Sequence, residues 1–175
     1  GLSLGGASLI DTTSGTNSSV VFDVHNFTSG SDNTISTSGD IIIRAQNAAA
    51  SIGIGGGIGD LSLSDNELSS FDAGGTLIIG DSTNGTGAVD LNSWDLSSTN
   101  YDVEIYGGAL DLGGLTLGTG DFLAHAQNGQ SLTISDAISK TVAGASTLTL
   151  RADQSITDNG FDITTSGGAL NVTAN

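Results

Sequence analysis

Residues 39–47 read GDIIIRAQN, and this stretch decides the fold of the chain. Bulky apolar side chains occupy alternate positions in it, and a basic residue, an alanine and a polar amide follow. Residues 120–128 (GDFLAHAQN) and 146–154 (STLTLRADQ) repeat the pattern. Alternation with a period of two is typical of a strand with one buried face. The stretch therefore predicts a strand that recurs along the chain.

Looser copies of the same pattern extend across most of the 175 residues. Aligned on the position of Ala45, the copies lie about 21 residues apart on average, a spacing that indicates a solenoid with one copy in each turn. We therefore expect an all-β fold, namely a single parallel β-helix of about eight turns that forms one domain over residues 1–175. The aligned positions are Asn26, Ala45, Asp65, Asp81, Gly107, Ala126, Ala152 and Ala174.

Charge and composition exclude several classes of partner. The chain has 3 Lys and Arg against 19 Asp and Glu, a formal net charge of −16, which repels nucleic acid and anionic lipid. No apolar stretch approaches the ~20 residues of a membrane-spanning helix, so we expect no membrane insertion. No cysteine is present, which excludes disulfides and thiolate metal sites. The acids are nearly all Asp, which indicates either turn formation or calcium binding, and we expect no other cofactor.

Basic and imidazole side chains recur at one position of the repeat. His25, Arg44, His125 and Arg151 each precede the residue on which the copies are aligned. If the turns stack in register, these four side chains form an outward basic column on an acidic rod. The alternative is that the end of a strand simply tolerates a long side chain there.

Aromatic residues gather in residues 91–106, which contain Trp94, Tyr101 and Tyr106. Aromatic side chains on a polar solenoid can stack on sugars, so these three residues are the candidate binding site. The competing interpretation is that Trp94 fills the core of a wide turn.

Two segments resemble a known family. Residues 146–158 (STLTLRADQSITD) and 167–175 (GGALNVTAN) are similar to the repeats of filamentous haemagglutinin-type bacterial exoproteins. The resemblance implies a right-handed parallel β-helix, export by a two-partner secretion or autotransporter route, and a role in adhesion or in a surface filament. It implies no shared catalytic residues.

These observations favour a structural protein that is secreted or displayed on the bacterial cell surface, either an adhesin shaft or a filament-forming solenoid, and not an enzyme. The alternatives are a segment of an adhesin that binds host or surface glycans or a receptor, and a β-helix enzyme that degrades polysaccharides. The sequence begins and ends in strand pattern without a polar cap. We therefore expect the ends to contact further turns of the same chain, or a second copy stacked end to end.

Overall fold

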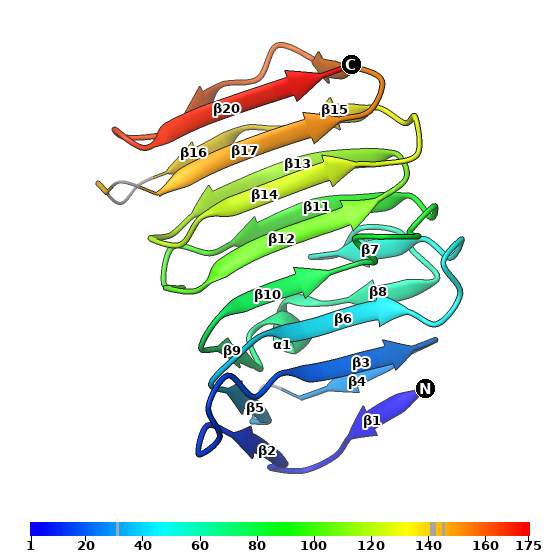
Figure 1. Cartoon of the computed structure of the whole chain (residues 1–175), viewed down its shortest axis with the longest axis vertical. Coiled ribbons are helices and arrows are strands. Elements are labelled where there is room, and N and C mark those ends of the chain that lie inside the picture. The colour runs from blue at the N-terminus through cyan, green and yellow to red at the C-terminus, as the bar shows by residue number, and fades with distance from the viewer. Residues whose placement is uncertain (31, 141–142, 145) are drawn as a thin grey trace.

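The chain forms a parallel β-solenoid of about seven turns, which confirms the expected fold class. The structure is a computed structural model that describes residues 1–30, 32–140, 143–144 and 146–175. Successive turns stack along one axis, so the two termini lie at opposite ends of the stack (Figure 1).

A seven-stranded parallel sheet runs the length of the solenoid. Its strands are hydrogen-bonded in the order β20-β17-β14-β12-β10-β6-β3, one strand for each turn. The strands are β3 (Val20–Val24), β6 (Ile41–Ala45), β10 (Thr76–Ile79), β12 (Asp102–Gly107), β14 (Phe122–Ala126), β17 (Thr147–Ala152) and β20 (Ala169–Ala174).

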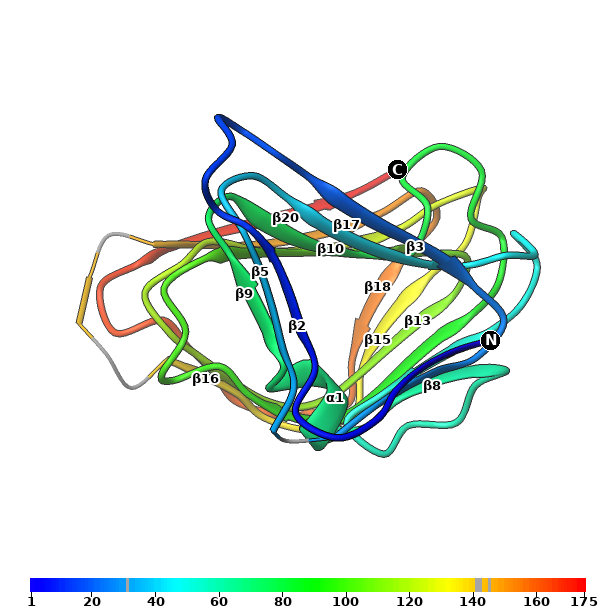
Figure 2. The same cartoon turned by 90° about the horizontal axis from the view of Figure 1, so that it is seen from below.

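The other sides of the solenoid are built by three further groups of strands, and the view along the axis is roughly three-sided (Figure 2). An eight-stranded sheet contains β7 (Ile52–Ile54), β8 (Leu61–Leu63), β11 (Val89–Asp95), β13 (Leu110–Leu117), β15 (Leu132–Ile134), β16 (Ile138–Lys140), β18 (Ile156–Asp158) and β19 (Ile163–Thr164). A three-stranded sheet contains β2 (Leu9–Thr12), β5 (Thr34–Thr37) and β9 (Phe71–Ala73), and β1 (Leu2–Leu4) pairs with β4 (Phe27–Ser29).

Alternating apolar residues form the core because every second side chain of a strand points to the same face. Ile43, Ile79 and Ile105 occupy matching positions on adjacent strands, and all three are fully buried. Burial of one such side chain stabilises the fold by about 1.5–3 kcal/mol. The repeat seen in the sequence is thus the row of side chains that stacks through the interior.

The structure has about seven turns, and the sequence predicted about eight. The copy at residues 61–66 does not add a strand to the seven-stranded sheet, because Leu61 and Leu63 lie on β8, which pairs with β7 in the eight-stranded sheet. Alternation alone does not reveal which side of a solenoid a strand occupies, so this copy was assigned wrongly.

A short helix, α1 (Asp65–Leu68), follows β8 and was not expected. Its signal is the Ser-x-x-Glu spacing of a capping box. Glu67 Oε2 accepts hydrogen bonds from the backbone N–H of Ser64 at 2.7 Å and from its hydroxyl at 2.8 Å. In the described part of the chain, no helix has the length and hydropathy to cross a membrane.

Glycines in residues 48–59 allow backbones to approach each other closely. A side chain at Gly57 would place its Cβ 1.9 Å from the carbonyl oxygen of Asp90, and one at Gly53 would place it 2.1 Å from that of Gly57. The neighbouring Ile58 N–H donates to Asp90 Oδ2 at 2.7 Å. Close approach of backbones therefore accounts for the many glycines of this segment.

Candidate functional site

The outward face of the seven-stranded sheet carries three of the four residues expected in the basic column. Tyr106 on β12 pairs with His125 on β14, and His125 pairs with Arg151 on β17. Lower in the same sheet, Arg44 follows Ile43, and Ile43 lies opposite Ile79 of β10. Arg44, His125 and Arg151 therefore share one column.

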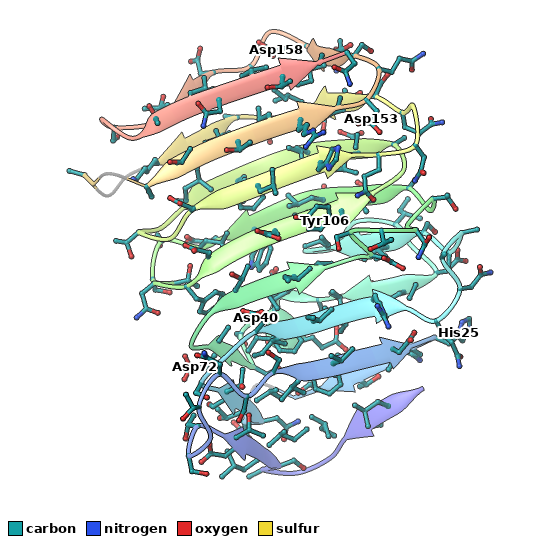
Figure 3. The ribbon with its side chains drawn as sticks, in the orientation of Figure 1. His25, Asp40, Asp72, Tyr106, Asp153 and Asp158 are labelled. Atoms are coloured by element: carbon teal, nitrogen blue, oxygen red, sulfur yellow. The ribbon has the colours of Figure 1, made fainter. Side chains whose placement is uncertain are left out.

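His25 lies outside this column, and its inclusion was wrong. The register pairs Val24 with Ala45 and Asp23 with Arg44, so Asp23 occupies the column position. His25 lies two residues further on, beyond the end of β3 (Figure 3). A shift of two residues leaves the same side chains facing inward, so alternation cannot distinguish the two registers.

Acidic groups accompany the basic ones along the column. Arg44 Nη2 lies 3.3 Å from Asp23 Oδ2, and His125 Nε2 lies 3.1 Å from Asp153 Oδ1. The hydrogen bond with His125 is the main reason that the pKa of Asp153 lies below its usual value. Two of the three basic or imidazole side chains of the column are therefore hydrogen-bonded to a carboxylate.

The aromatic residues expected to form one site lie in two places. Trp94 and Tyr101 line a pocket of about 550 Å³ between α1, β9 and the segment after β11. Tyr106 instead lies on the outward face of the seven-stranded sheet, where its ring meets His125 edge-on with the centroids 6.0 Å apart. Trp94 is only 6% exposed and belongs to the hydrophobic core.

The pocket beside Trp94 exists because one side of the solenoid changes its strand pairing. The three-stranded sheet ends at β9, and residues 96–101 of the next turn form no strand. The Tyr101 side chain crosses this gap, and its hydroxyl donates to the carbonyl oxygen of Phe71 at 3.3 Å. Asp65, Asp72 and Asp95 add three carboxylates to the pocket wall.

Both tyrosines have raised pKa values. Burial, aided by the charge of Asp72, raises the pKa of Tyr101 to about 12. Burial also raises the pKa of Tyr106 to about 12, assisted by its 2.7 Å hydrogen bond to Glu104 Oε2. Each environment disfavours the phenolate.

Because the chain has two tyrosines, absorbance at 295 nm reports both ionisations directly. We expect both to ionise near pH 12 in the folded protein and near pH 10 in denaturant. The stabilisation from the neutral phenols is complete below pH 10 and is lost as the pH rises through about 12. In the Tyr101→Phe variant, the one absorbance transition that remains belongs to Tyr106. Ionisation of either residue near pH 10 in the native state would contradict the two environments.

Comparison of the chain with protein family models, curated proteins and solved structures gave no match.

Aspartates at the N-terminal ends of strands in the seven-stranded sheet join successive turns. Asp40 Oδ1 accepts the backbone N–H of Thr76 at 2.9 Å, and Asp102 Oδ1 accepts that of Asp121 at 2.8 Å. Asp121 Oδ1 in turn accepts the N–H of Thr147 at 2.6 Å. These three carboxylates thus act as hydrogen-bond acceptors between successive turns. Among the described residues, no group of three or more His, Asp or Glu side chains gathers as a metal site, and calcium binding stays a prediction.

Removal of one carboxylate from this series should weaken the junction between two turns. We expect Asp121→Ala to lower the free energy of unfolding by about 1–2 kcal/mol, because the N–H of Thr147 loses its acceptor. Asp121→Asn keeps the acceptor oxygen and removes only the charge, so it should retain most of the stability. Urea denaturation followed by circular dichroism measures both variants. Equal losses in the two would assign the effect to charge.

The sequence did not predict that the carboxylates of the pocket lie together. Asp65, Asp72 and Asp95 come from α1, β9 and β11, so only the folded chain brings them to one pocket. A signal did exist in residues 96–101 (LSSTNY), where the alternating pattern stops. That interruption marks the side of the solenoid at which a strand is missing.

Proposed function

We propose that this chain is a structural element of a bacterial surface or extracellular protein, either the shaft of an adhesin or the repeating unit of a filament. The observation that supports this role is the seven-stranded parallel sheet, which connects every turn to the next by backbone hydrogen bonds. The assignment to the cell surface rests on the resemblance to filamentous haemagglutinin-type repeats.

The mechanism is mechanical. The buried aliphatic stack and the backbone hydrogen bonds between strands of successive turns together resist bending and stretching, because each turn packs only on its neighbours. The formal charge of −16 keeps neighbouring rods apart through electrostatic repulsion. This role requires no catalysis.

Apolar side chains at the end of the stack provide the contact for end-to-end stacking or for further turns of the same polypeptide. Leu170 and Val172 on β20 are 44% and 53% exposed, although their partners Leu148 and Leu150 on β17 are buried. Another turn placed on β20 would cover both residues and satisfy its backbone edge. We propose that a second copy or a further turn occupies this position.

Electron microscopy of the negatively stained protein, with millimolar calcium and with chelator, tests the structural role. Filaments would identify an assembly unit, and dependence on calcium would place the ion at the joint. Single rods in both conditions would identify a shaft. Compact particles, or release of reducing ends from acidic and neutral glycans, would contradict the proposal.

Matched valine variants test the joint itself. Val172→Asp places a charge on the end of the stack, whereas Val21→Asp places it on the outward face of β3, where the valine is 51% exposed. Filaments lost only in Val172→Asp support stacking through β20. Equal behaviour of both variants in a protein that forms filaments would exclude this end as the contact.

A further inference from the structure

The outer edge of β9 has no neighbouring strand in the described part of the chain. β9 pairs with β5 on one side and is the last strand of its sheet. On the β5 side, the carbonyl of Ser70 accepts from Ile35 and the N–H of Gly74 donates to Thr37, each at 2.8 Å. Successive residues of a parallel strand direct their backbone N–H and C=O groups to opposite sides of the strand. The backbone groups of Phe71 and Ala73 therefore point away from β5, toward the edge without a neighbouring strand.

Two adjoining pockets run along this edge, and together they form what we call the β9 groove. The pocket of about 550 Å³ and a second of about 410 Å³ share Asp72, Asn100 and Tyr101 in their walls. The second extends from Asp72 to Thr76, so the groove follows β9 along its length. Figure 2 shows β9, with β2 and β5, along one side of the three-sided cross-section, near α1.

The β9 groove is acidic and has no basic counterpart. Its walls contain four carboxylates, and no Lys, Arg or His is among the described residues that line it. The three Lys and Arg residues of the chain, Arg44, Lys140 and Arg151, all lie outside the residues that line the two pockets. The carboxylates belong to Asp65, Asp72, Asp95 and Asp102.

The floor of the groove is apolar. Leu68, Phe71 and Trp94 line it, and each is no more than 6% exposed. Such a floor accommodates the aliphatic stem of a lysine or arginine whose charged head reaches a carboxylate. It offers no broadly exposed aromatic face, because Trp94 is packed into the core, and this argues against sugar stacking.

We propose that the β9 groove binds an extended peptide segment of a partner protein, with lysine or arginine at alternate positions, by addition of a strand to the edge of β9. Main-chain hydrogen bonds to Phe71 and Ala73 provide affinity that is independent of side chains. Alternate basic side chains then point toward the carboxylates, because every second residue of a strand shares one face. Tyr101 moves aside as its hydroxyl gives up the carbonyl of Phe71 to the incoming strand. The inference is independent of the proposed structural role.

Trp94 makes the binding measurable, because it is the single tryptophan of the chain and lines the groove. The probe is an eight-residue peptide in which Lys alternates with Val, titrated at low ionic strength while tryptophan fluorescence is recorded. We expect saturable binding that weakens as salt is added. A peptide with the same sequence and N-methyl groups on alternate backbone nitrogens should bind at least about tenfold more weakly, because it cannot extend the sheet.

Charge variants separate recognition from general attraction to an acidic rod. Asp72→Asn should weaken binding by roughly tenfold. The control Asp111→Asn removes an equal charge from the exposed side of β13, outside the groove, and should change binding by less than about twofold. Equal binding of the methylated peptide, equal effects of the two variants, or a fluorescence change with neutral glycans and none with the peptide would each overturn the proposal.

Discussion

Replacement of Gly80 with alanine is expected to lower the free energy of unfolding by about 3–5 kcal/mol, a large effect for the addition of a single methyl group. Gly80 follows β10 and has a backbone φ of +97°, which residues with a side chain rarely adopt. A Cβ there would also lie 1.9 Å from the carbonyl oxygen of Tyr106 in the next turn. Backbone strain and a clash between turns therefore act together.

A matched glycine separates these two contributions. Gly160 has φ at +90°, and a Cβ there would meet no atom within 4 Å. Gly160→Ala should therefore cost only about 1–2 kcal/mol, the strain alone. Chemical denaturation of both variants gives the comparison. Similar losses would show that the spacing between turns at Gly80 tolerates a side chain.

Replacement of Phe27 with alanine is the second large effect that we expect, a loss of about 3–5 kcal/mol. Phe27 is 1% exposed on β4, and its ring centroid lies 5.4 Å from that of Phe22 and 5.6 Å from that of Phe71. The three rings join the first turns across the interior. Truncation leaves a cavity that the rigid strand ladders around it cannot fill.

Phe161→Ala is the control for this substitution, because Phe161 is 38% exposed. It should cost about 1 kcal/mol or less. Thermal unfolding followed by circular dichroism ranks the two variants. A Phe27→Ala protein as stable as Phe161→Ala would contradict the packing of the aromatic cluster.

Much of the architecture could be predicted from the sequence because it depends on local alternation. Residues 39–47 and their copies alternate apolar and polar side chains, and a strand with such a pattern must bury one face. Ile41 and Ile43, for example, are both fully buried on β6. The parallel stacking followed from the recurrence of the copies at an average spacing of about 21 residues.

Details of pairing could not be predicted in this way. Alternation assigned His25 to a column that Asp23 occupies, and it assigned residues 61–66 to the wrong side of the solenoid. Both errors preserve the faces of the strands, so no local pattern opposes them. Long-range packing decides between registers. In the observed register, Phe22 and Val24 lie opposite Ile43 and Ala45, and the ring of Phe22 packs against that of Phe27.

The candidate sites depended on the tertiary structure even more strongly. Trp94, Tyr101 and Tyr106 are close in sequence, yet the chain turns between β11 and β12 and places Tyr106 on another sheet. Asp65 and Asp95, 30 residues apart by their numbering, line the same pocket. The sequence by itself determined the solenoid, because alternation buries one face of each strand and the recurrence of the strand along the chain stacks one copy in each turn. Only the tertiary structure decided the register and the β9 groove, because both depend on which turns lie side by side.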